Sequence, residues 1–318
     1  MRAPALPCME ATGKLVEQLG QIPQLIVSGI TSGCIYAIVA VGFSVVYSST
    51  KVINFAQGEF VMVGAMVGAA MLEKYSLVVT LPVAILAGCL VGAFVAVCLL
   101  IPLRKATVIT MIIVTVGASI MLRGLAQLFW GETVRSVPPF TGMVVKTGGV
   151  AQIEDRTFHL FGAVVRAQEL WVVVITALLV VGMYLFFKYT LIGQAMRACS
   201  MNPGGARLVG ISVRKMIVAS FVLSAALASI TGIAVAPISS ARPEMGTFLG
   251  LKGFCAAVLG GMGNFGGGVV AGILLGIVES LVAGLLWSDY RDAVAFVILI
   301  AILFIRPEGI LSRRKAEA

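Results

Sequence analysis

Apolar residues in this chain lie in long continuous runs. Four uncharged stretches, at residues 18–50, 75–103, 216–241 and 253–278, are each longer than the roughly 20 residues that a helix needs to cross a bilayer. The apolar positions do not alternate with polar ones, as the strands of a membrane barrel would. The pattern therefore predicts an all-α fold, a polytopic bundle of transmembrane helices.

The runs divide into nine apolar segments, two of which have polar interruptions. They are residues 23–47, 53–72, 79–101, 107–130, 170–187, 216–236, 249–263, 268–287 and 293–305. The segment 249–263 is short for a span and holds several glycines, which break helices. We expect it to be a broken but complete crossing, because a re-entrant segment would put the basic tail on the outer side.

Composition excludes a soluble protein. The chain of 318 residues is 59% hydrophobic and 12% charged, and its mean hydropathy is +1.06. Soluble domains carry about a quarter charged residues. The net charge of +9 is therefore an indicator of topology, since lysine and arginine gather in cytoplasmic loops of membrane proteins.

Basic residues distinguish the two long polar loops. The loop 188–215 has five basic residues and no acidic residue, whereas the loop 131–169 has four of each. The positive-inside bias predicts that 188–215 is cytoplasmic and 131–169 lies outside. With nine crossings, the basic tail 307–318 is then cytoplasmic, the membrane domain spans 23–306, and the N-terminal extension 1–22 lies outside.

Ionisable residues inside the apolar segments are costly in lipid and mark candidate sites. One of them, Glu59, follows Asn54, Gln57 and Gly58, which interrupt the helical pattern. These residues suit an unwound segment that lines a cavity. They equally suit a cytoplasmic loop that ends at a helix N-terminus, where the helix dipole stabilises the carboxylate.

Three further ionisable residues in the apolar segments have positions that can be interpreted in more than one way. Lys252 and Glu279 could pair inside the bundle, but the position of Lys252 near the start of its segment favours an interface, which its long side chain could reach. A small shift of its helix end would bring Arg123 to the outer surface, so we base no pathway role on it.

Glycine provides a second signal. Gly268, Gly272 and Gly276 are spaced by four, which places a stripe of small residues on one helix face for close packing. The glycine-rich run at 260–268 is predicted to be non-helical. We therefore predict a translocation pathway lined on one side by Asn54, Gln57, Gly58 and Glu59. A broken segment with Gly260, Gly261 and Asn264 would face them.

Motifs for enzymatic chemistry are missing from the sequence. There is no G-x-x-x-x-G-K-[ST] phosphate loop and no G-x-S-x-G, and the one histidine, His159, lies in a polar loop. The six cysteines form no C-x-x-C pair. We expect no catalytic residues, no metal site and no cofactor, and any ATP would be used by partner subunits.

Three blocks of the sequence resemble one known family. Residues 28–43 lead into 52–59, which is similar to the family signature I-N-F-A-[HQ]-G-E. Residues 193–198, 202–203 and 206–211 resemble its coupling loop, although Gly204-Gly205 departs from the expected pattern. Residues 250–254 and 256–263 form the third block. The family that these blocks resemble is the H-type membrane subunit of branched-chain amino-acid ABC importers, and the resemblance extends from about residue 25 to 306–309.

The resemblance implies a multi-pass permease subunit of the bacterial inner membrane. Its partners would be a second permease subunit, two cytoplasmic ATP-binding subunits and a periplasmic substrate-binding protein that docks on 131–169. ATPase coupling would fall on Arg197, Arg207 and Gly210, in a loop with short helices near 194–200 and 205–210. A urea or short-amide permease of the same class remains an alternative, as does a stand-alone channel or secondary transporter.

Overall fold

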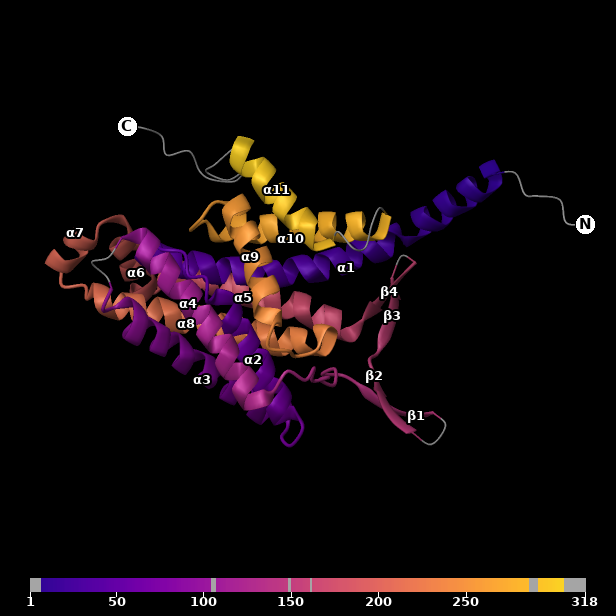
Figure 1. Ribbon diagram of the computed structural model, residues 1–318, viewed down its shortest axis with the longest axis horizontal. Helices are drawn as coiled ribbons and strands as arrows, with labels where there is room; N and C mark the ends of the chain where they lie inside the picture. Colours follow the sequence, from indigo (N-terminus) through magenta and orange to yellow (C-terminus); the bar gives the residue numbers. More distant parts are fainter. Residues whose placement is uncertain (1–6, 104–106, 148–149, 161, 286–290, 306–318) are drawn as a thin grey trace, which may run out of the picture.

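The computed structural model describes residues 7–103, 107–147, 150–160, 162–285 and 291–305, so the tail 307–318 lies outside the described residues. Apart from two hairpins, the regular structure there is helical (Figure 1). The helices are α1 (Pro7–Thr50), α2 (Gln57–Leu72), α3 (Leu77–Phe94) with the π-helix η1 (Val95–Leu100), α4 (Val108–Trp130), α5 (Ala167–Tyr189), α6 (Leu191–Met201), α7 (Pro203–Leu208), α8 (Val213–Ser239), α9 (Met245–Gly260), α10 (Phe265–Leu285) and α11 (Arg291–Ile305).

Each of the nine predicted apolar segments corresponds to a helix, with different bounds, in the described part of the chain. Among the described residues, six helices are long and apolar enough to cross a membrane, and three apolar helices are shorter: Gln57–Leu72, Met245–Gly260 and Asp292–Ile302. The protein is a polytopic helical bundle, as the sequence predicted. α1 begins at Pro7, within the N-terminal extension, and runs without a break into the first span.

The core of the bundle forms around α1, which packs along α10, α8 and α9. The stripe of small residues on α10 faces α1: Gly272 lies against Ala37, and Gly276 against Gly33. A Cβ added at Gly33 would lie 2.6 Å from the Cα of Ile273, so the two backbones approach too closely for any side chain there. The predicted packing stripe is confirmed.

The break expected inside 249–263 lies only near the end of that segment. α9 is an unbroken helix of 16 residues, about 24 Å long at 1.5 Å per residue, so it is short for a span of about 30 Å. Gly250 and Gly253 lie inside it, because each is pressed against a neighbouring segment, at Gly58 and Val39 respectively. The break comes later, at Gly261, where φ is +86°.

The prediction of a non-helical run over 260–268 is therefore only half correct. Residues 261–264 form the turn, but α10 starts at Phe265 and includes Gly266, Gly267 and Gly268. Gly267 packs against the backbone of Gly260. Tight packing between α9 and α10 offsets the low helix propensity of glycine at these positions.

The two long polar loops lie at opposite ends of the bundle (Figure 1). One end carries α6 and α7, close to the two short helices predicted for 188–215. The other carries two antiparallel hairpins that the sequence did not predict. Their strands are β1 (Met143–Thr147), β2 (Val150–Glu154), β3 (Thr157–Leu160) and β4 (Ala163–Arg166). That the loops lie on opposite sides of the membrane stays a prediction.

Candidate functional site

The chain between α1 and α2 is unwound and largely buried. α1 ends at Thr50, and Lys51 has a φ of +57°, a backbone conformation that favours glycine. Asn54 is 1% exposed, and its side-chain oxygen accepts a hydrogen bond from the amide of Ala56 at 3.1 Å. The segment is therefore buried, and it leads into a helix N-terminus; that it lines a cavity stays a prediction.

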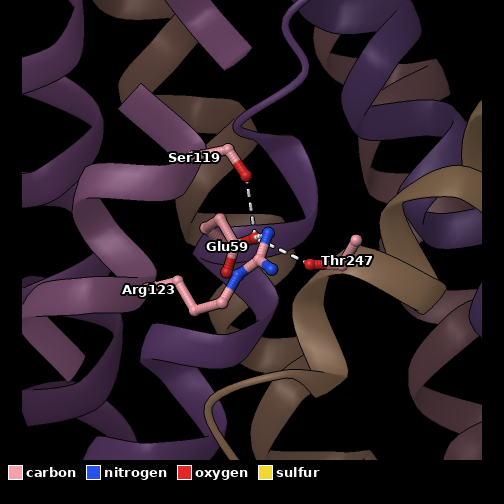
Figure 2. Close-up of polar contacts among 4 residues, drawn as sticks. All are labelled: Glu59, Ser119, Arg123 and Thr247. Carbon is pink, nitrogen blue, oxygen red and sulfur yellow. Dashed lines mark hydrogen bonds and ion pairs between the residues drawn. The ribbon is translucent and has the colours of Figure 1, made fainter. Parts of the chain in front are cut away.

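Glu59 lies in the first turn of α2 and is 1% exposed. Its Oε1 atom accepts hydrogen bonds from Ser119 at 2.9 Å and Thr247 at 3.3 Å, and it forms an ion pair with Arg123 Nη2 at 3.5 Å. Figure 2 shows that these groups converge on the carboxylate from two other helices, α4 and α9. We call Glu59, Ser119, Arg123 and Thr247 the Glu59 cluster.

The Glu59 cluster is not fully satisfied. Glu59 Oε2 and Arg123 Nε are buried and have no hydrogen-bond partner among the described residues. A buried polar atom without a partner costs about 1–3 kcal/mol, and such an atom calls for an explanation such as a functional role. Arg123, to which we gave no pathway role, turns towards Glu59, and its side chain is 30% exposed.

The contact between α2 and α4 has a polar stripe. Thr115, Ser119 and Arg123 are spaced by four, so they share one face of α4. Thr115 Oγ1 accepts from the amide of Phe55 at 3.2 Å, and the other two side chains reach Glu59. α4 is therefore attached to the unwound segment and the start of α2 largely through polar groups.

Gln57 forms a second polar contact at the start of α2 and is fully buried. The hydroxyl of Ser224 lies 2.6 Å from Gln57 Oε1 and 2.9 Å from the carbonyl oxygen of Gly42. A hydroxyl has one hydrogen and can serve only one of these acceptors at a time. With the amide turned over, its NH₂ would donate to Ser224, whose hydroxyl would donate to Gly42, and the amide oxygen would take the place of the buried Nε2 atom, which has no hydrogen-bond partner among the described residues.

The predicted pathway residues fall into two separate places. Gly58 packs against Gly246 and Gly250, in the first half of α9. Gly260, Gly261 and Asn264 lie at the other end of that helix, where Gly260 packs on Gly267 and Asn264 Oδ1 accepts from the amide of Gly267 at 3.2 Å. The start of α9, with Thr247, is therefore the part that contacts the Glu59 segment.

Lys252 and Glu279 form a buried ion pair. Their Nζ and Oε1 atoms are 2.7 Å apart, and the two side chains are 8% and 0% exposed. Tyr36 also donates to Glu279 Oε1 at 3.2 Å, and Lys252 makes a second ion pair with Asp292 on α11 at 2.7 Å. The structure shows the pairing with Glu279, the alternative that we did not favour: α9 begins at Met245, which places Lys252 more than one turn inside the helix.

The α6–α7 end carries the predicted coupling residues. Arg197 lies with its guanidinium carbon 5.6 Å from the ring centroid of Phe187, Arg207 is in the last turn of α7, and Gly210 has a φ of +83° that requires glycine. Asn202 caps α7 by accepting from the amide of Gly205 at 2.9 Å. Gly204 and Gly205 leave room for this cap, since an added Cβ at either would lie 3.2–3.3 Å from the Asn202 side chain.

Sequence reasoning missed Ser119, Thr247 and Ser224, and it gave Arg123 no role. Single hydroxyl residues are frequent in membrane helices, where they bond to neighbouring backbone, so composition does not distinguish these three. The spacing of Thr115, Ser119 and Arg123 on an otherwise apolar helix was the available signal.

Comparison with known proteins gives a consistent result. A family described as "Branched-chain amino acid transport system / permease component" matches residues 25–303. The high-affinity branched-chain amino acid transport system permease protein LivH of Escherichia coli K12 is 31% identical over 313 residues, covering 95% of this chain and 99% of that protein. The permease protein BraD of Pseudomonas aeruginosa, named for the same kind of system, is 31% identical and covers 92% and 97%. A probable branched-chain amino acid permease of Methanocaldococcus jannaschii is 30% identical and covers 93% and 94%.

Proposed function

Since the chain belongs to the family of permease components of branched-chain amino acid transport systems, we propose that it moves branched-chain amino acids inward as a membrane subunit of an ABC importer. The observation that carries this proposal is the extent of the family match, which covers all of the apolar helices except the ends of the first and last. The chain is a multi-pass inner-membrane protein, as its relatives are. The substrate class comes from the names of those relatives.

ATP hydrolysis on partner subunits would drive the transport, and we propose the α6–α7 end as their docking surface. Three large apolar side chains there are strongly exposed: Met201 at 85%, Leu208 at 90% and Val209 at 75%. They lie beyond the ends of the spans α5 and α8, so lipid tails do not account for their exposure. Exposed apolar groups outside the membrane mark interaction surfaces, and Arg197 and Arg207 add positive charge.

We propose that the translocation pathway passes Asn54, Gln57, Gly58 and Glu59, with Gly260, Gly261 and Asn264 along the same route. The structure supports the first group most directly, because buried polar atoms without partners occur on Asn54, Gln57 and Glu59. An α-amino acid carries one positive and one negative charge, and the Glu59–Arg123 pair offers a charge complementary to each. Alternating access would expose this pair to one side of the membrane at a time.

The other partners follow from the same proposal. A second permease subunit would complete the pathway, and a periplasmic substrate-binding protein would dock on the hairpin end at 131–169. Arg123 is a partly exposed cation within an apolar helix, and a polar pathway or a neighbouring subunit would supply the environment that lipid does not.

The test is reconstitution. The chain is co-expressed with its neighbouring genes, purified, and placed in liposomes with leucine, valine, urea or short amides and a loaded binding protein. ATP-dependent uptake of leucine and valine, absent without the ATPase subunits, is the expected result. Flux from this chain alone would overturn the importer assignment, and uptake of urea or amides in place of leucine would overturn the substrate class.

A further inference from the structure

A cavity of about 590 Å³ lies at the α6–α7 end of the bundle. It opens among the ends of α1, η1, α4 and α8 and the turn after α7, and it is separate from the Glu59 cluster. Its walls are largely apolar, with Leu100, Met111, Ile217 and Phe221 among them. Leu100 is the last residue of η1, a six-residue π-helical stretch. π-Helical turns are rare in proteins as a whole, but those that occur are often at functional sites.

Two arginines give the cavity its charge. Arg207 and Arg214 both line it and are exposed, and no acidic residue is among its lining residues. Neither arginine forms an ion pair within the described part of the chain. Lys51, with its strained backbone, lies between the lining residues Thr50 and Val52 and adds a third cation nearby. An anion is therefore the complementary ligand.

The apolar surface continues from the cavity to the outside of the bundle. Val97 on η1 is 49% exposed, and Ile109 and Ile113 on α4 are 69% and 64% exposed. These residues neighbour the lining residues Leu100, Ile101 and Met111 in sequence. A ligand with a charged head in the cavity and an apolar chain along this face would be matched at both ends, whereas a free anion would use only the arginines.

We propose that this cavity binds an acidic phospholipid, whose phosphate contacts Arg207 and Arg214 and whose acyl chain lies against η1 and α4. The position suits a lipid, because the cavity lies at the ends of membrane-spanning helices, on the side predicted to be cytoplasmic. Basic pockets between helices on that side are suited to anionic headgroups. The lipid would join the ends of α1 and α4 to the α7–α8 turn next to the proposed ATPase surface.

The test measures lipid retention by mass spectrometry. The chain, purified with its co-expressed partners, is exchanged into excess phosphatidylcholine, and the phosphatidylglycerol retained per complex is quantified. We expect retention to fall about fivefold in Arg214→Gln, from the contribution of one basic side chain near an anionic membrane. Met111→Trp, which fills the cavity without changing charge, should also lower it. Lys215→Gln is the matched control, since Lys215 is exposed and adjacent but does not line the cavity.

Two results would overturn the proposal. One is equal retention in Arg214→Gln and Lys215→Gln; because Arg214 is exposed, this comparison stands even if Met111→Trp fails to fold. The other is displacement of phosphatidylglycerol by an excess of inorganic phosphate or leucine, which would show that the cavity recognises a free anion. Loss in both Arg214→Gln and Met111→Trp, without displacement by those solutes, would support the lipid.

Discussion

Lys252 on α9 and Glu279 on α10 meet in an ion pair of 2.7 Å that is almost completely removed from solvent. Both charges also have further partners, since Asp292 reaches Lys252 from α11 and Tyr36 reaches Glu279 from α1. Four helices therefore converge on one pair of opposite charges. We therefore assign the pair a role in holding the bundle together.

Removing one member of this pair should destabilise the protein strongly. Lys252→Met leaves a buried carboxylate without its cation, which costs about 3–5 kcal/mol. The double change Lys252→Met with Glu279→Leu removes both charges and should recover most of that loss. Thermal unfolding in detergent, followed through the exposure of buried cysteines such as Cys255, gives the measurement.

Asp292→Asn is the control for this prediction. The Asp292 side chain is 58% exposed, so its share of the interaction is solvent-screened and should be at most about 1 kcal/mol. A double variant that is less stable than Lys252→Met alone would show that the pair is not the source of the effect.

The sequence was sufficient for the fold but not for this pair. Continuous apolar runs predicted the helices, because a backbone in lipid must form its own hydrogen bonds. The pairing of Lys252 with Glu279 was named but not favoured, because a four-residue error at the start of α9 moves a side chain by about one turn of helix. The hairpins at 143–166 were missed as well, because each of their strands has only four or five residues. Strands this short show little of the alternation of apolar and polar residues by which a strand is predicted.

The Glu59 cluster shows a different limit of prediction from the sequence. Helix-breaking and polar residues at 54–59 indicated one part of the site, the part that this segment supplies. The partners Ser119 and Thr247 are 60 and 188 residues away, and their approach depends on how α4 and α9 pack. No local pattern contains that information.

Neutralising Glu59 tests the proposed pathway. Glu59→Gln keeps the shape of the side chain and an oxygen that can accept from Ser119, but it removes the charge opposite Arg123. We expect uptake in liposomes to fall at least tenfold, while the yield of assembled complex stays within about twofold. A change of one charged hydrogen bond is worth about 1.5–3 kcal/mol, which corresponds to that range.

Glu73→Gln serves as the matched control. Glu73 also forms an ion pair with an arginine, Arg135, at 3.1 Å, but the Glu73 side chain is 59% exposed at the far end of α2. Its substitution should leave uptake near the wild-type level. Equal uptake in Glu59→Gln and Glu73→Gln would remove Glu59 from the pathway.

Gln57 offers a test of the second polar contact. Gln57→Leu fills a similar volume and cannot bond to Ser224, so we expect uptake to be abolished with assembly intact; Asn54→Leu should behave in the same way. Gln127→Leu, on the partly exposed face of α4, is the control and should transport normally. Loss of assembled complex in Gln57→Leu, as judged by gel filtration, would mean that the residue holds the helices together and does not serve the pathway.

Reversing the charge of Arg207 tests the proposed coupling surface. If ATPase subunits dock on α7 through Arg207, an acidic side chain there meets groups arranged for a cation, and like charges at an interface cost several kcal/mol. Arg207→Glu should leave ATP hydrolysis by the complex but separate it from leucine uptake, measured as transported leucine per ATP. Lys215→Glu reverses a nearby charge outside the cavity and should keep the wild-type ratio.

Because Arg207 also lines the proposed lipid cavity, Arg214→Gln separates the two roles: a normal ratio there assigns the Arg207 effect to docking, whereas an equal loss would assign it to the lipid. An unchanged ratio in Arg207→Glu itself would remove this residue from the coupling surface.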